Sequence, residues 1–193
     1  GIETTKYNRY TGETIMANTT FSGPVISKNG FYSTGPGNVV DADANTSLTV
    51  ADHAGRIIHN DAAGAVTYTL PALNANANAA VAGDVDYNNK SNIGAKFTIV
   101  SSITKTGSLI VKVANANDIM TGMATIVDTD TADNMEGFMT AATSDTITLN
   151  GSTTGGVTHA TIECVALSST QWKVSVNTGG TGDLATPFSA TVS

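Results

Sequence analysis

The sequence is poor in aromatic and charged residues. Of its 193 residues, 6% are aromatic and 13% are charged, although 40% are hydrophobic. Thr, Ser, Asn, Ala and Gly fill the gap. Such a chain has too little Glu, Lys, Leu and Arg for a helical bundle. It is typical of β-proteins, because Thr favours extended backbone while Gly and Asn favour turns.

Cations are the scarcest charged residues. Nine Lys and Arg stand against 16 Asp and Glu, which gives a net charge of −7. A nucleic-acid-binding surface needs clustered cations to neutralise phosphates. The densest group here is Lys90, Lys96, Lys105 and Lys112, and acidic and apolar residues separate its members. We therefore predict no nucleic-acid partner, and we interpret the acidity as a source of solubility before assembly.

Cysteine and long apolar runs are also nearly missing. Cys164 is the only cysteine, so an intrachain disulfide is excluded, and its apolar neighbours predict a buried, inert thiol. No apolar stretch approaches the length that a bilayer requires. The first residues lack the basic-then-apolar pattern of a secretory signal. We expect synthesis in a cytoplasm, without export by the general route and without a membrane partner.

The first fifteen residues have an unusual feature. Gly12-Glu13 can be encoded by a purine-rich, ribosome-binding sequence, which would lie just before the codon of Met16. We therefore expect that Met16 is the natural start and that residues 1–15 are a translated leader. A polar arm of native origin is the alternative.

Residues 16–40 are rich in turn-forming residues. Gly23-Pro24, Asn29-Gly30 and Gly35-Pro36-Gly37 leave room only for short extended pieces. We predict an extended N-terminal arm that lies on a neighbouring protein or on the domain itself. Its large apolar side chains are Phe21, Val25, Ile26, Phe31 and Tyr32.

From residue 41 to about 180 a two-residue period predicts a single β-domain. In residues 66–70 the apolar side chains alternate with threonines until Pro71 ends the run. The predicted fold is an all-β sandwich or jelly roll of nine or ten short strands. Residues 74–94 form a long polar loop, and residues 181–193 a C-terminal tail. The strand-like runs cover residues 47–50, 56–59, 66–70, 97–100, 109–113, 124–127, 146–149, 157–165 and 172–176.

Catalytic motifs are missing from the sequence. It contains no G-x-S-x-G elbow, phosphate-binding P-loop or H-E-x-x-H zinc motif. His53, His59 and His159 are too scattered to indicate a metal site. We predict a protein that is not an enzyme and that holds no cofactor.

Calcium is the one metal for which a pattern exists. Asp41, Asp43, Asn45 and Asp52 occupy positions 1, 3, 5 and 12 of a twelve-residue loop, but Thr46 stands where an EF-hand needs glycine. A second acidic cluster spans residues 128–136. Both patterns are commoner as solvated turns, so we predict no metal and keep Ca²⁺ as the alternative. The acidic residues of the second cluster are Asp128, Asp130, Asp133 and Glu136.

Several short sequence segments within residues 46–189 are similar to segments found in one group of proteins. They lie at residues 48–56, 67–72, 94–100, 145–151, 172–174 and 185–189. Together they resemble the decoration, or cement, proteins of tailed-phage capsids, especially those of marine phages. The long loop at 74–94 interrupts the pattern.

This resemblance implies a structural virion protein on the capsid exterior. It implies a β-domain, often a homotrimer, that binds the major capsid protein and stabilises the shell. The physics agrees, because a trimer engages a repetitive surface at three linked sites. We expect the interface to use apolar residues of both termini, with a local core role as the alternative for each. These residues are Phe21, Val25, Ile26, Phe31, Tyr32, Pro187 and Phe188.

A receptor- or glycan-binding fibre or spike domain is the second hypothesis. Thr- and Asn-rich loops and the single Trp172 would suit a sugar-binding face, although a tryptophan within a strand is more often in the core. A polysaccharide-degrading enzyme is disfavoured, because the sequence shows no convincing pair of carboxylates.

Overall fold

The computed structural model describes residues 38–74, 92–130 and 134–192. The chain divides into two compact units, Gly1–Gly35 and Pro36–Ser193. The predicted leader, most of the predicted arm and most of the loop at 74–94 lie outside the described residues. The same holds for five of the predicted interface residues, which are Phe21, Val25, Ile26, Phe31 and Tyr32.

The larger of two sheets has seven strands, and both of its edge strands are short. Its centre is made of long strands that alternate between buried and exposed residues. In spatial order the strands are β1 (Val39–Asp41), β3 (Ile57–Asn60), β5 (Lys96–Ser101), β10 (Val157–Ala166), β11 (Gln171–Gly180), β7 (Ile119–Asp128) and β8 (Met135–Met139).

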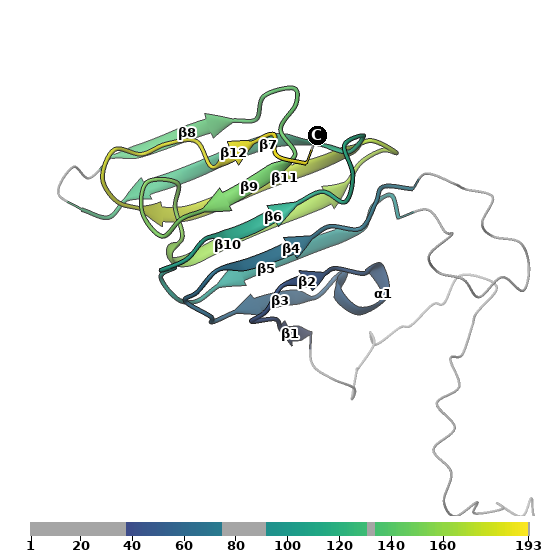
Figure 1. Cartoon of the computed structure of the whole chain (residues 1–193), viewed down its shortest axis with the longest axis horizontal. Coiled ribbons are helices and arrows are strands. Elements are labelled where there is room, and N and C mark those ends of the chain that lie inside the picture. Colours follow the sequence, from purple (N-terminus) through teal and green to yellow (C-terminus); the bar gives the residue numbers. More distant parts are fainter. Residues whose placement is uncertain (1–37, 75–91, 131–133, 193) are drawn as a thin grey trace, which may run out of the picture. The chain divides into compact units, whose positions relative to one another are not determined.

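The smaller sheet has five strands and lies over the larger one (Figure 1). In spatial order they are β12 (Phe188–Ser189), β9 (Thr146–Leu149), β6 (Leu109–Lys112), β4 (Val66–Thr69) and β2 (Thr46–Ser47). The one helix in the described parts, α1 (Val50–His53), is four residues long. None of the described helical structure is long and apolar enough to span a membrane.

The chain alternates between the two sheets in its first half. β1, β3 and β5 stack in parallel in the larger sheet, while β2, β4 and β6 stack in parallel in the smaller one. Each passage of the chain through both sheets is one coil, with one strand in each sheet. The next coil stacks on it in parallel, and we call each such coil a rung and the stack of three coils the ladder. The later strands β9 and β10 add antiparallel pairs next to β6 and β5. The result is two mixed sheets, in which turns between successive rungs lie above one another.

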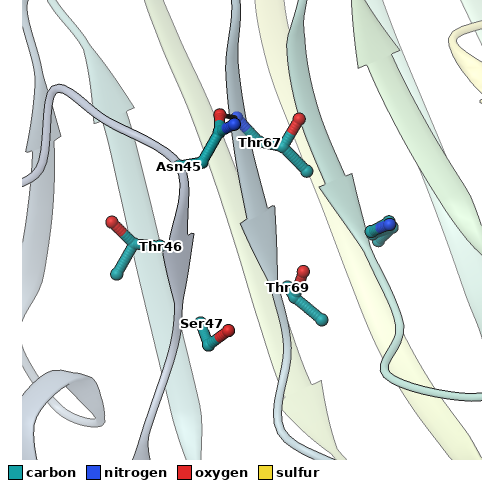
Figure 2. Close-up of a pocket in the computed structure, with 6 residues that line it drawn as sticks. Asn45, Thr46, Ser47, Thr67 and Thr69 are labelled. Atoms are coloured by element: carbon teal, nitrogen blue, oxygen red, sulfur yellow. Dashed lines mark hydrogen bonds between the residues drawn. The ribbon is translucent and has the colours of Figure 1, made fainter.

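The two-residue period places one side of each strand inside. In β4, Val66 and Tyr68 are buried, while Thr67 and Thr69 lie on the opposite face, beside Ser47 of β2 (Figure 2). The alternation is regular because side chains of an extended strand point to opposite faces in turn.

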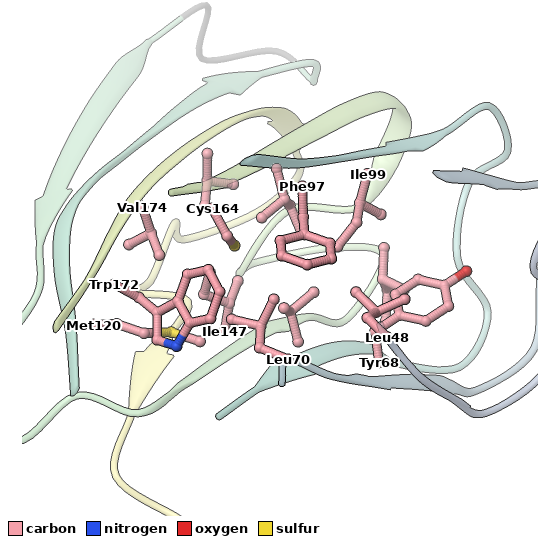
Figure 3. Close-up of a cluster of buried hydrophobic side chains, with 14 of the residues drawn as sticks. Leu48, Tyr68, Leu70, Phe97, Ile99, Met120, Ile147, Cys164, Trp172 and Val174 are labelled. Atoms are coloured by element: carbon pink, nitrogen blue, oxygen red, sulfur yellow. The ribbon is translucent and has the colours of Figure 1, made fainter. Parts of the chain in front are cut away.

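The core fills the space between the sheets (Figure 3). Tyr68 and Leu70 from the smaller sheet face Phe97, Cys164 and Trp172 from the larger one. The rings of Phe97 and Trp172 meet edge to face, with centroids 5.8 Å apart. Burial raises the pKa of the Cys164 thiol to about 12, which agrees with the predicted inert cysteine.

The predicted all-β sandwich is confirmed, whereas a jelly roll is not. Five of the ten strand pairings are parallel, and the described residues contain twelve strands where nine or ten were expected. Two boundaries also differ from the expected ones. Val39–Asp41, placed in the arm or at its end, forms β1, and Phe188–Ser189, placed in the tail, forms β12.

Candidate functional site

Three surface features of the domain combine chemistry with exposure. The first, the turn cluster, groups polar side chains at the turns that follow β1, β3 and β5. The second, the hydroxyl depression, lies on the outer face of β2, β4 and β6. The third, the methionine edge, is the outer face of β7 and β8.

The turn cluster contains a row of three hydrogen-bonded side chains. His59 Nδ1 lies 2.9 Å from Asp41 Oδ1, and His59 Nε2 lies 2.8 Å from Ser102 Oγ. The parallel register explains the row, because Asp41 pairs with His59 across β1 and β3, and β5 ends next to them at Ser101. Residues distant in sequence thus meet on three neighbouring strands.

This row has the connectivity of a Ser–His–Asp triad, with nucleophile, base and orienting carboxylate in hydrogen-bond contact. Two features differ from a working triad. The Asp41 side chain is 77% exposed, whereas the acid of a triad is buried. The backbone N–H of Ser102 donates to the Asn60 carbonyl and so is not free to stabilise an oxyanion. The row ties three strands together.

The turn cluster also contains a buried lysine. Lys105 Nζ donates to Asn60 Oδ1 at 2.9 Å and to the Ala62 carbonyl. Burial lowers its pKa, and the negative charge of Asp43 acts in the opposite direction. Tyr68 donates to the Ala42 carbonyl, and burial raises its pKa to about 12. These bonds pair the buried polar groups of the turns, as buried groups require.

Two carboxylates also meet in the turn cluster. The backbone N–H of Asp61 donates to Asp43 Oδ1 at 2.9 Å, and this bond is the largest cause that lowers the pKa of Asp43. The hydrogen bond between the two side chains raises the pKa of Asp61, and the charge of Asp43 adds to it. The pair therefore holds a proton more readily than two separate aspartates.

In the first of the two acidic clusters for which Ca²⁺ was the alternative, the polar side chains accept hydrogen bonds from the protein itself. Asp43 and Asn45 accept backbone N–H bonds from Asp61 and Thr67, and Asp52 accepts from the Thr49 hydroxyl. In the second cluster Asp133 lies outside the described residues. No group of three or more His, Cys, Asp or Glu side chains within residues 38–74, 92–130 and 134–192 is arranged to hold a metal.

The hydroxyl depression is a shallow hollow of about 330 Å³ (Figure 2). Asn45 fixes one side of it, because its Oδ1 accepts the Thr67 N–H at 2.8 Å. The lining is polar, with one cation and no aromatic ring. It consists of Asn45, Thr46, Ser47, Thr67, Thr69 and Lys112.

The methionine edge is the most apolar of the three features. Met123 pairs with Met139 and Val127 pairs with Met135 across β7 and β8. All four side chains point away from the core, with exposed fractions of 53%, 68%, 48% and 69% respectively. β8 ends the larger sheet, so among the described strands its outer edge pairs with nothing. Exposed apolar surface and an open strand edge are both features of protein-binding sites.

Sequence reasoning did not find this edge. Four of the five methionines lie between residues 120 and 139, a concentration that could have indicated it. Of the predicted interface residues that the structure describes, Pro187 and Phe188 are buried, and Phe188 belongs to the core. Trp172 is fully buried, away from any sugar-binding face.

Comparison of the chain with protein-family models, with curated proteins and with solved structures found no match.

Proposed function

We propose that this protein is a structural virion protein that binds the outer surface of a tailed-phage capsid as a homotrimer and stabilises the shell. The observation that carries the proposal is the methionine edge. Four large exposed apolar side chains lie on the edge strand β8 and on its neighbour β7. The free energy falls when another protein covers this surface and removes it from water. A catalytic role needs no such surface, whereas an assembly protein does.

The sequence supports the phage assignment. The short sequence segments at residues 48–56, 67–72 and 94–100 resemble segments of capsid decoration proteins. In the fold, these segments lie at or next to β3, β4 and β5. The partners on this reading are the major capsid protein and further copies of the chain. The net charge of −7 and the polar outer faces suit a protein that stays soluble until it meets the shell.

The N-terminal arm is the segment proposed to hold the shell. Residues 16–37 carry five large apolar side chains but too little regular pattern for a strand pair of their own. We expect removal of residues 16–37 to leave the β-domain folded, because the core cluster begins at Ala42. Attachment to the capsid should weaken, because a trimer loses three linked contacts at once.

The experiment adds purified protein to capsids that lack it and measures bound copies by sedimentation. The full chain should saturate the capsid, and the truncated chain should bind weakly while its circular dichroism spectrum shows that the β-domain is still folded. Full occupancy by the truncated chain would exclude the arm as the attachment segment. Failure of the full chain to bind at all would contradict the proposed function.

One observation favours a second function, that of a glycan- or receptor-binding spike domain. The hydroxyl depression could hydrogen-bond to a sugar, although no aromatic side chain lines it and Trp172 is in the core. Replacing Thr69 by Val and Lys112 by Ala should abolish binding on a glycan array if this function is right. Under the decoration function, neither the parent protein nor the variant binds any glycan.

A further inference from the structure

We propose that the methionine edge of one copy is covered by Phe31 and Tyr32 of a neighbouring copy, which links the subunits head to tail in a closed ring. This inference builds on the proposed function by naming the partner of that edge as a second copy of the chain.

The methionine edge has a notch of the right kind for an aromatic ring. Gly137 lies between Met135 and Met139 on the exposed face of β8, and it pairs with Thr125 of β7. A Cβ atom built on Gly137 would have nothing within 4 Å, so the space above it is open. Two flexible methionine side chains flank this space. Methionine sulfur makes favourable contacts with aromatic rings and adapts its shape to them.

The chain itself contains suitable aromatic residues in one place. Five of its eleven aromatic side chains lie within residues 1–37 and one more is Tyr87. The five in the described parts belong to the core or pack against it. They are Tyr68, Phe97, Phe138, Trp172 and Phe188. Only the N-terminal segment therefore offers an adjacent aromatic pair, Phe31-Tyr32, to the edge.

Charge also favours this segment. Lys28 is the only charged residue within residues 16–37. Glu136, the charged residue of β8, is exposed on the face of the strand opposite to Gly137. A cation three residues before the aromatic pair can approach this carboxylate when the segment lies along the strand edge, where extended peptides add to sheets.

Geometry decides between a subunit's own edge and that of its neighbour. The arm joins the domain at β1, and β1 and β8 are opposite edges of the seven-stranded sheet. Six strand spacings cover about 29 Å. The eight residues from Val39 back to Phe31 span at most about 29 Å when every residue is fully extended. The turn-forming Gly35-Pro36-Gly37 within this stretch shortens it below that limit. The pair therefore reaches the β8 edge of another copy.

Such a contact joins two different surfaces, the arm of one subunit and the β8 edge of the next. Contacts of this head-to-tail kind close into rings when the rotation between subunits permits. A trimer, as proposed above, is one such ring. Each copy then gives one aromatic pair and receives one.

The direct experiment replaces Phe31 by the photoreactive aromatic p-benzoyl-phenylalanine, which keeps a ring at that position. The protein is mixed with an equal amount of ¹⁵N-labelled wild-type chain, allowed to exchange subunits, irradiated and digested. We expect crosslinks from position 31 to the ¹⁵N-labelled peptide that contains Met135 and Met139. Crosslinks within one chain, crosslinks to another surface, or no crosslink to this peptide would each overturn the inference.

A matched pair of variants tests the notch. Gly137→Thr fills the open space with a side chain that a strand accommodates well, whereas Gly64→Thr adds the same group where nothing lies within 4 Å in a different surface turn. Both variants should fold, with far-ultraviolet circular dichroism spectra like that of the parent. Gly137→Thr should melt at a somewhat lower temperature, because it loses the stabilisation that association gives to the folded state. Light scattering should show a monomer for Gly137→Thr and the parent oligomer for Gly64→Thr. An oligomeric Gly137→Thr protein would overturn the inference.

Capsid binding, measured separately, distinguishes the two proposals. An oligomer with the expected crosslinks that ignores capsids would contradict the decoration function alone. A Gly137→Thr protein that remains oligomeric and occupies capsids fully would contradict the head-to-tail contact alone.

Discussion

At the scale of single residues, Trp172 is the largest fully buried side chain of the described residues. It contacts Phe97 edge to face, and its Nε1 has no hydrogen-bond partner among the described residues. Trp172→Ala should lower the free energy of unfolding by about 3–5 kcal/mol, because it leaves a large cavity. Trp172→Phe should cost less, since it keeps a ring and removes the unpaired N–H.

Chemical denaturation of the two variants checks this prediction. Equal stability of Trp172→Ala and the parent protein would show that the indole is not part of the core. Loss of a ligand without loss of stability would favour the spike-domain function instead.

The Asp43–Asp61 pair should make stability depend on pH. The pKa of Asp61 is raised in the fold, so its contribution to stability is present while it is protonated and is lost as the pH rises through that raised pKa. Asp61→Asn keeps an N–H donor for Asp43 and removes the repulsion. Its melting temperature should exceed that of the parent near neutral pH, and the difference should shrink in acid. A difference that is the same at every pH would contradict this account.

At the scale of elements, the long strands β7 and β11 approach each other at one glycine. A Cβ on Gly122 would lie 1.8 Å from the Val174 carbonyl oxygen. Gly122→Ala should therefore destabilise the domain by at least about 1–3 kcal/mol, since the strands must separate. Gly64→Ala is the matched control, because a Cβ atom there meets nothing within 4 Å. Thermal melting should separate the two, and similar melting would refute the close approach.

Individual strands were readable from the sequence where the alternation is regular. Residues 66–70 and 109–113 contain β4 and β6 almost to the residue. In the first run apolar residues alternate with Thr until Pro71, and the second is rich in Ile and Val, which favour strands. The run at 47–50 was wrong at its end, since the Thr49 hydroxyl caps α1 by accepting the Asp52 N–H. The sequence analysis missed β8, because Met-Glu-Gly-Phe-Met does not show the alternation of a strand. It is an edge strand that pairs with β7 alone among the described strands.

The sites were less predictable than the strands. Asp41, His59 and Ser102 meet because β1, β3 and β5 pair in parallel with a fixed register. No short sequence motif allows that register to be predicted. The notch at Gly137 likewise depends on which face of β8 points outward. The sequence predicted the arm and its apolar side chains, but not the surface that they would cover.

At the scale of the whole molecule, the ladder and the edge have separate roles in the proposed assembly. The stacked parallel strands and the core between the two sheets form the domain. The methionine edge is the surface at which we propose that copies join. Residues beyond that contact, Phe21, Val25 and Ile26, then remain for the capsid. A protein of this design works through many weak, repeated contacts, so its copy number should follow the symmetry of the shell.

Copy number is therefore the most direct measurement of the central claim. Quantitative mass spectrometry of purified virus particles, with the major capsid protein as internal standard, gives the number of copies per particle. A decoration protein should be present in hundreds of copies, in fixed proportion to the capsid protein. A handful of copies per particle, as expected of a fibre or spike, or none at all, would contradict the account.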